Sequence, residues 1–218
     1  AYSLLRSNVT TLTNMPGVLT MALAMSLVPA ISASVARRDK SSVQNISRRG
    51  IELALILGLP CAVGLFVLAK PILGMLYPRL TEAQLSLAAD LLHTASIGVI
   101  FLSLVQAMTG IIQGLGKPNV PLFNLFIGFI LKVITLVVLT NIPSINIQGA
   151  SISTVICYAF AGIADTAYAV RKAHINMNLW DVILKPVLSS AVMGAMVYMC
   201  FAFMNKLGHV TPGVLLSV

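Results

Sequence analysis

The chain has 218 residues, of which 58% are hydrophobic and only 9% are charged, and its mean hydropathy is +0.95. Soluble globular domains carry about 25% charged residues, so this composition excludes an ordinary soluble domain and indicates a membrane protein. The net charge of +8 does not indicate nucleic-acid binding, because the basic residues stand at the ends of apolar runs without interleaved aromatic residues.

Six apolar runs follow one another along the chain, separated by clusters of charge. A helix needs about 20 apolar residues to cross a bilayer, whereas the strands of a membrane barrel would alternate in hydropathy, which is not seen here. We therefore expect an all-α, polytopic transmembrane helical bundle. Residue 1 is Ala, and a further apolar run begins in the last residues, which favours a piece of a longer protein. The expected spans cover residues 9–35, 51–69, 83–115, 120–140, 147–170 and 182–204.

The first run contains Pro16 and Pro29, and the second contains Pro60. Proline removes a helical hydrogen bond, so the sequence predicts bent helices, which are common in transporters but also occur as static kinks. The first run also carries a polar stripe along one helical face. Its members are Arg6, Thr10, Asn14, Gly17 and Met21.

Loop charges predict the orientation, because Lys and Arg accumulate in short cytoplasmic loops. Nine basic residues fall in loops 36–50, 116–119 and 171–185, which we expect to be cytoplasmic in a multi-pass protein of the cell membrane. The cluster from Arg37 to Arg49 is typical of topology and of contact with anionic lipid headgroups. The alternative is a specific contact with an anionic substrate at the cytoplasmic mouth.

The second and third runs also carry charged or titratable residues near their ends, for which the sequence suggests specific roles. Glu52 follows Arg48 by four residues, the spacing of an ion pair on a helix surface. Asp90 and His93 are three residues apart near the outer end of the third run. They could serve proton coupling, because His titrates near neutral pH, or simply mark a wet helix end.

The third run combines small residues with amides. Ser96, Ser103 and Gly110 are spaced by sevens, and Gly114 completes a G-x-x-x-G pattern, so these residues predict close helix packing. Gln106 lies at the edge of this stripe, where a buried amide must find hydrogen-bond partners.

A lysine interrupts the fourth run, which is otherwise uncharged from residue 119 to residue 140. Lys132 lies on the semi-polar face with Asn124 beside it, opposite a face that should meet lipid. Lysine at the centre of a span costs about 2.5–3.5 kcal/mol on insertion scales. Its ammonium either snorkels to the outer interface along its stem or faces water or an anion. The expected lipid-facing residues are Phe123, Phe126, Ile130 and Val137.

The fifth run has a polar stripe of its own, formed by Thr154, Tyr158, Ala161, Asp165 and Tyr168. Asp165 is six residues from Arg171, so we expect it to be solvated at the cytoplasmic interface. Cys61, Cys157 and Cys200 all fall inside expected spans and should be small buried residues, since their spacing predicts neither a disulfide framework nor a metal site.

No pattern in the sequence is typical of catalysis. There is no carboxylate pair, no Ser/His/Asp arrangement and no glycine-rich phosphate loop after a strand. The loops are mostly basic, whereas a membrane-embedded transferase would normally show acidic or His clusters there. The sequence therefore does not indicate an enzyme, with a membrane-embedded transferase acting on lipid-linked sugars as the alternative, and we expect no cofactor.

Four stretches carry a family resemblance: residues 14–40, 58–77, 113–134 and 146–172. In order and spacing they resemble the stage V sporulation protein B branch of polysaccharide exporters. That branch is related to MurJ-type lipid II flippases and, more distantly, to MATE drug exporters. The resemblance covers nearly the whole chain and implies that its six spans are helices eight to thirteen of a fourteen-helix, two-lobe protein. Most of the C-terminal lobe would be present, and the N-terminal lobe would be missing.

The resemblance also implies a function. The protein would flip a lipid-linked oligosaccharide or peptidoglycan precursor across the cytoplasmic membrane by alternating access, in spore cortex or cell-wall synthesis. Its partners would be the anionic lipid-linked glycan, membrane lipids and the missing lobe of the same chain, with no nucleic acid. A cation-coupled drug exporter, which should carry acidic cavity residues, and a non-transporting structural membrane protein, which should not need Lys132, are the alternatives.

Cationic cavity residues are held to meet the diphosphate in the MurJ-type relatives, and Lys132 resembles such a residue. The cavity arginine of those relatives would fall nearer Thr10 than Arg6, so Arg6 could replace it only if the helix entry differs. The candidate substrate-binding residues are Lys132, Arg6, Asn124, Gln106 and Asn14.

Overall fold

The structure, a computed structural model, describes residues 2–78, 80–141, 148–173, 180 and 184–206. All the regular secondary structure within these residues is helical, which confirms the expected fold class. The helices are α1 (Tyr2–Ala36), α2 (Lys40–Val67), α3 (Ala69–Leu76), α4 (Glu82–Gly114), α5 (Asn119–Thr140), α6 (Gly149–Ala173) and α7 (Lys185–Lys206).

Five of the described helices, α1, α2, α4, α5 and α6, are long and apolar enough to cross a membrane. They correspond to the first five expected spans and make the chain a multi-pass membrane protein. The sixth expected span corresponds to α7, whose described apolar stretch, Lys185–Cys200, is shorter.

Helix α2 begins at Lys40, earlier than the expected span over residues 51–69, so residues 40–50 of the expected loop over 36–50 are helical and the expectation of a loop there is wrong. Asp39 caps this helix: its carboxylate accepts hydrogen bonds from the Ser42 backbone N–H at 3.0 Å and from the Ser42 hydroxyl at 2.7 Å. Val43 and Ser47 are then buried at helical spacing. Hydropathy detects only the apolar part of a helix and therefore misses a capped polar extension.

The cap makes the stability of this junction depend on pH. The hydrogen bond from the Ser42 backbone holds the pKa of the Asp39 carboxyl below its ordinary value. A depressed folded pKa means that the stabilisation is complete above the unfolded pKa, about 3.9, and is lost as pH falls through the folded pKa. We expect Asp39→Asn, which can still cap, to flatten the acid limb of the thermal stability profile of the full-length protein. Asp90→Asn, at an exposed carboxylate, is the matched control, and an acid limb equal to that of wild type would contradict this role of Asp39.

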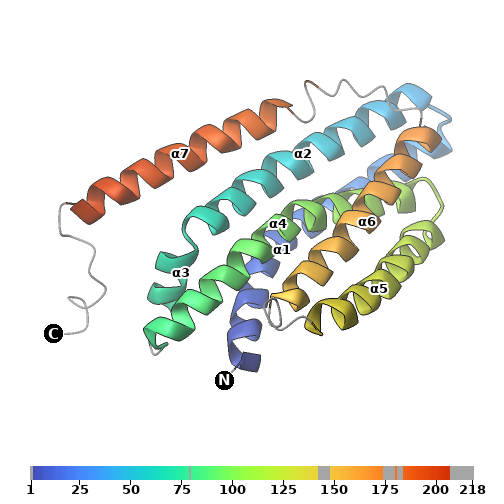
Figure 1. The fold of residues 1–218 in the computed structure, drawn as a ribbon. Coiled ribbons are helices and arrows are strands. Elements are labelled where there is room, and N and C mark those ends of the chain that lie inside the picture. The colour runs from blue at the N-terminus through green and yellow to red at the C-terminus, as the bar shows by residue number, and fades with distance from the viewer. Residues whose placement is uncertain (1, 79, 142–147, 174–179, 181–183, 207–218) are drawn as a thin grey trace.

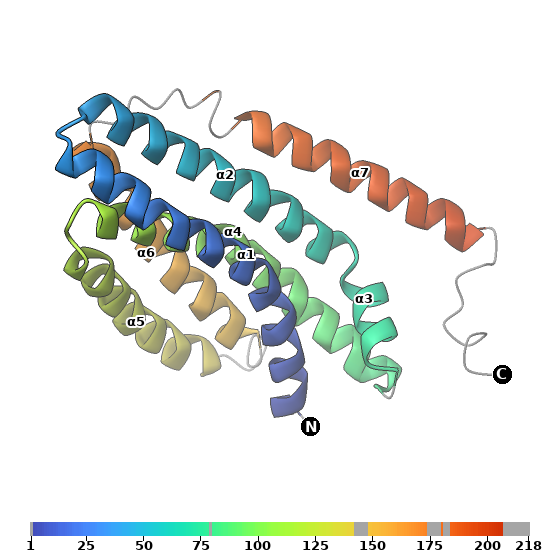
Figure 2. The same cartoon turned by 180° about the vertical axis from the view of Figure 1, so that it is seen from behind.

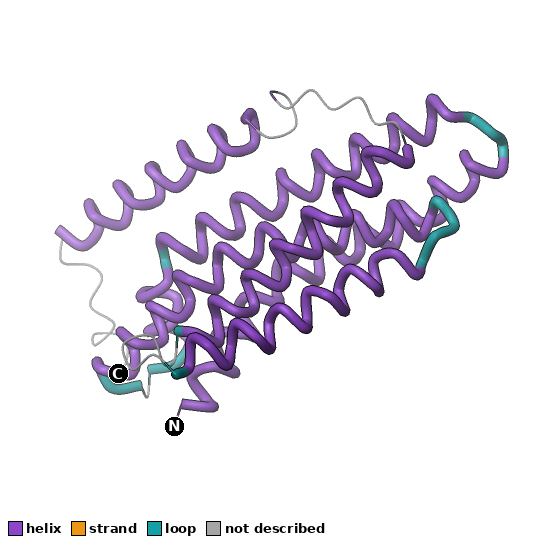
Figure 3. Tube along the Cα trace, turned by 45° about the vertical axis from the view of Figure 1, so that its right-hand side comes forward, coloured by secondary structure: helices purple, strands orange, loops and turns teal. Residues whose placement is uncertain are grey.

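Helix α4 lies at the centre of the bundle (Figures 1 and 2). It packs against α1, α2, α3 and α6, while α5 rests mainly on α6 and α7 rests on α2. The small residues expected to pack do so: Ser96 and Ser103 are 1% exposed, and Gly110 and Gly114 are buried against α1. The long helices run alongside one another (Figure 3), and α1 bends along its length (Figure 2), with Pro16 and Pro29 inside it.

The α1–α2 and α4–α5 connections and the end of α6 lie at one end of the bundle, and the α3–α4 connection lies at the other (Figure 1). The first of these ends is basic, as the loop charges predict. Its described basic residues are Arg37, Arg38, Lys40, Lys117, Arg171 and Lys172.

The outer surface of α5 matches the expected lipid-facing face. Phe123, Phe126, Ile130 and Val137 are all exposed, as they must be to contact acyl chains. The cysteines match only in part, because Cys157 is buried and Cys61 half-buried, whereas Cys200 is exposed on α7. Its expected burial is therefore wrong, since α7 presents that face to no described helix.

Candidate functional site

A cavity of about 180 Å³ lies between four helices in the half of the bundle away from the basic end. This volume is large enough to hold several water molecules. The lining residues are Val9, Thr10, Thr13 and Asn14 from α1, Leu91, Ala95, Gly98, Val99 and Leu102 from α4, Lys132 from α5, and Ala150, Ser151, Thr154, Val155 and Tyr158 from α6.

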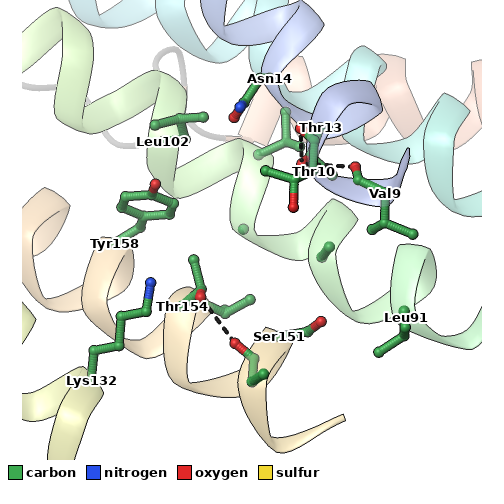
Figure 4. A pocket seen from close by; sticks show the side chains of 15 residues that line it. Val9, Thr10, Thr13, Asn14, Leu91, Leu102, Lys132, Ser151, Thr154 and Tyr158 are labelled. Carbon is green, nitrogen blue, oxygen red and sulfur yellow. Dashed lines mark hydrogen bonds between the residues drawn. The ribbon is translucent and has the colours of Figure 1, made fainter. Parts of the chain in front are cut away.

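Lys132 is the single charged residue among these lining residues. It is half-buried, and its stem crosses from α5 so that its ammonium points toward Tyr158 and Thr154 (Figure 4). No carboxylate of the described residues lies within ion-pairing distance of it. The ammonium offers three hydrogen-bond donors in a compact positive charge, which suits an anion.

The other polar side chains of the cavity come from α1 and α6. Thr13 and Thr154 donate their hydroxyl protons to backbone carbonyls of their own helices, Thr13 to Val9 at 3.1 Å and Thr154 to Ala150 at 2.9 Å. Asn14 and Tyr158 present an amide and a phenol to the same space (Figure 4). The cavity therefore combines one cation with neutral polar groups, a lining suited to an anionic group with several oxygen acceptors.

The candidate substrate-binding residues do not all line the same cavity. Lys132 and Asn14 share the cavity, whereas Gln106 lies at the α1–α4 interface, where the Thr20 hydroxyl donates to its amide oxygen. This half-buried amide thus has a hydrogen-bond partner within the bundle. The Arg6 side chain lies outside the described residues.

Asn124 lies away from the cavity, at the α5–α6 interface. Its amide nitrogen donates to Oδ1 of Asp165 at 2.7 Å, and Asp165 is 1% exposed. The expected solvation of Asp165 at the interface is therefore wrong, because packing against α5 covers a residue that its distance from Arg171 places near the headgroups.

Sequence reasoning did not select Thr13 and Ser151, which also line the cavity. Thr13 stands three residues after Thr10 and so lies on the same helical face. Ser151 precedes Thr154 by three residues and shares its face of α6. The periodicity that located Asn14 and Thr154 could have found both.

A second hollow of about 620 Å³ lies between α2 and α7. It includes Arg48 and Glu52, which form the expected ion pair at 2.8 Å, together with Lys185. This ion pair balances one positive charge of the basic cluster from Arg37 to Arg49 with a carboxylate of the same helix. The hollow is separate from the cavity of Lys132.

Comparison with known proteins agrees with a multi-pass membrane protein. The family model described as lipid II flippase MurJ matches residues 4–218. The uncharacterized membrane protein YabM of Bacillus subtilis is 26% identical over 185 residues, 84% of this chain and 33% of that protein. Stage V sporulation protein B of the same organism is 26% identical over 169 residues, 78% of this chain and 32% of that protein.

Lipid II flippase MurJ of Bacillus subtilis is 26% identical over 184 residues, 82% of this chain and 32% of its own length. The chain thus spans about a third of the length of these curated relatives. Because the family model covers nearly the whole chain, the chain belongs to the MurJ lipid II flippase family.

Proposed function

We propose that the chain is one lobe of a transporter that flips a lipid-linked anionic glycan or peptidoglycan precursor across the cell membrane. The observation that carries this proposal is Lys132, a cation in a polar cavity within a membrane bundle, with no carboxylate of the described residues beside it. A desolvated diphosphate needs such a counter-charge, because moving an anion into a low-dielectric region is costly.

The position of the lysine supports contact with substrate rather than with the membrane surface. Lys132 is eight residues before the end of α5, about 12 Å along the helix axis. Its ammonium points inward to the cavity, toward α6 (Figure 4). Snorkelling would require the stem to run along α5 toward its end.

Alternating access requires a second wall that closes the cavity on the other side. The relatives are about three times as long as this chain, so the rest of the full-length protein is the proposed source of that wall. The basic end of the bundle is the proposed cytoplasmic end. An anionic headgroup would then pass Lys132 in the outer half of the membrane.

The two alternative functions, a cation-coupled drug exporter and a structural membrane protein, fit the cavity less well. A cation-coupled exporter of cationic drugs should place carboxylates in it, and none of its described lining residues is acidic. A purely structural membrane protein would not need a lysine there, at an insertion cost of about 2.5–3.5 kcal/mol.

Water accessibility at position 132 tests the proposal. Lys132→Cys is made in the full-length, otherwise Cys-free protein and treated with a membrane-impermeant thiol reagent. We expect rapid labelling that lipid II, used as the probe, slows. Thr154→Cys in the same cavity should behave alike, whereas Phe126→Cys, on the lipid-facing surface, should stay unlabelled. Absence of labelling at both cavity positions would contradict the proposal that water reaches this cavity. Labelling that lipid II leaves unchanged would argue against contact between Lys132 and the substrate.

A further inference from the structure

A polar pair, the buried Asp165 and the half-buried Asn124, joins α5 to α6 outside the cavity of Lys132. Oδ1 of Asp165 accepts a hydrogen bond from Nδ2 of Asn124 at 2.7 Å. The other carboxyl oxygen, Oδ2, is buried and has no hydrogen-bond partner among the described residues. Asp165 is 1% exposed, so protein atoms cover the carboxyl on all sides.

The surroundings of this carboxyl are apolar. One turn before it, Gly162 faces Leu104 and Val105 of α4, and one turn after it, Ala169 belongs to the apolar core with Met108. No titratable residue occurs in α4 between residues 94 and 114. No described cation lies within ion-pairing distance of Asp165.

The titratable groups on the elements packed against Asp165 lie elsewhere or are already paired. Lys132, the one such group on α5, is eight residues from Asn124, about 12 Å along the axis, and lines the cavity. On α2, Arg48 and Glu52 bind each other, and Lys40 and Arg49 are exposed. On α6 itself the groups near Asp165 are Tyr158, Tyr168, Arg171 and Lys172.

An ionised carboxylate in such a place is expensive, because one neutral amide hydrogen bond does not replace its hydration. Sodium would need several oxygen ligands, yet α5 and α6 are continuous helices at this point, so their backbone carbonyls are engaged in helical hydrogen bonds. A proton needs only the carboxyl oxygen itself.

We propose that Asp165, held by Asn124, is a proton-binding site between α5 and α6 and that the proton is bound in the conformation described here. Binding forms one O–H bond on the carboxyl with a proton taken from water, and release returns that proton to water. Release requires water to reach the carboxyl, and therefore requires α5 to separate from α6 at the basic end of the bundle.

The site would couple proton binding to the position of α5. Helix α5 is held mainly by α6, so loosening this interface frees a helix that carries Lys132. Protonation would thus favour the arrangement in which Lys132 lines the cavity. Coupling to flipping rests on the proposed function, whereas proton binding itself does not.

Infrared spectroscopy of the full-length protein tests proton binding without any substrate. We expect the carbonyl stretching band of a protonated carboxylic acid at neutral pH, present in wild type and lost in Asp165→Asn. Asp90→Asn is the matched control, because Asp90 is exposed, and it should keep the band. Equal spectra for wild type and Asp165→Asn would overturn the proposal.

A second variant covers the case in which Asp165→Asn does not fold. Asn124→Ala keeps the carboxyl but removes its hydrogen bond, so the band should shift in frequency rather than vanish. A band unchanged in Asn124→Ala would contradict its assignment to Asp165.

The pH dependence of lipid II flipping then tests the coupling. We expect the rate in wild-type liposomes to vary with pH and this dependence to be lost in Asp165→Asn. A merely structural role predicts the wild-type pH profile, because asparagine can still hydrogen-bond Asn124. If the infrared band behaves as expected but even the wild-type protein does not flip lipid II, proton binding by Asp165 stands and the proposed function fails.

Discussion

Replacing Lys132 with glutamine is expected to lower the rate of lipid II flipping by about ten- to a hundredfold, because a hydrogen bond to a charged group is worth about 1.5–3 kcal/mol. Glutamine keeps a polar side chain of similar reach, so the loss reports the charge itself. The measurement is flipping by the full-length protein in liposomes, with binding of lipid II measured in parallel.

Two further variants sharpen this prediction. Lys132→Arg retains the charge but brings a larger, planar group, so we expect partial activity. Lys117→Gln removes an equal charge from the exposed α4–α5 connection and should flip like wild type. Wild-type flipping and binding by Lys132→Gln would contradict the substrate contact and would favour a structural role for this lysine.

Replacing Gly110 with alanine is expected to destabilise the full-length protein by about 3 kcal/mol, the upper part of the range for overpacking. A Cβ atom at this position would lie 2.6 Å from the carbonyl oxygen of Ala24 and 3.0 Å from its Cα. These are backbone atoms of α1, so the contact can be relieved only by moving the two helices apart. Unfolding in denaturant, followed at equilibrium, measures the loss.

Gly64 on α2 offers the matched control, because a Cβ atom there would meet nothing within 4 Å. Gly64→Ala should be neutral or stabilising by up to about 1 kcal/mol, since alanine favours the helix. If the Gly110→Ala protein proved as stable as the Gly64→Ala protein, the close contact between α1 and α4 at Gly110 would be contradicted. The same approach places Thr10 and Asn14 of α1 at the cavity, so Gly110→Ala should also impair flipping.

Much of the fold could be predicted because helix periodicity is a local property. The outward face of α5, with Phe123 and Phe126, and the packed face of α4, with Ser96 and Ser103, follow from placing residues at 100° intervals. The face of α5 that carries Lys132 follows in the same way, since the opposite face is aromatic and branched, whereas the sequence left open whether its ammonium points to the cavity or to the outer interface. Loop charges likewise predicted which ends of the helices share one side.

Helix boundaries were less predictable where the membrane does not dictate them. Residues 40–50 are polar, so hydropathy indicated a loop, whereas the cap at Asp39 and the burial of Val43 extend α2 through them. The exposure of Cys200 similarly depends on which helices cover α7, and an apolar sequence does not specify its neighbours.

The amino-acid sequence by itself determined that this is a multi-pass helical membrane protein, which face is polar in four of its six expected spans, and that one of those faces carries a central lysine. Only the tertiary structure decided the partners of the polar side chains. Gln106 pairs with Thr20, 86 residues away, and Asn124 pairs with Asp165, 41 residues away. Periodicity orients a side chain about its own helix, but which group it meets depends on how the helices pack, and close contacts such as Gly110 against Ala24 set that packing.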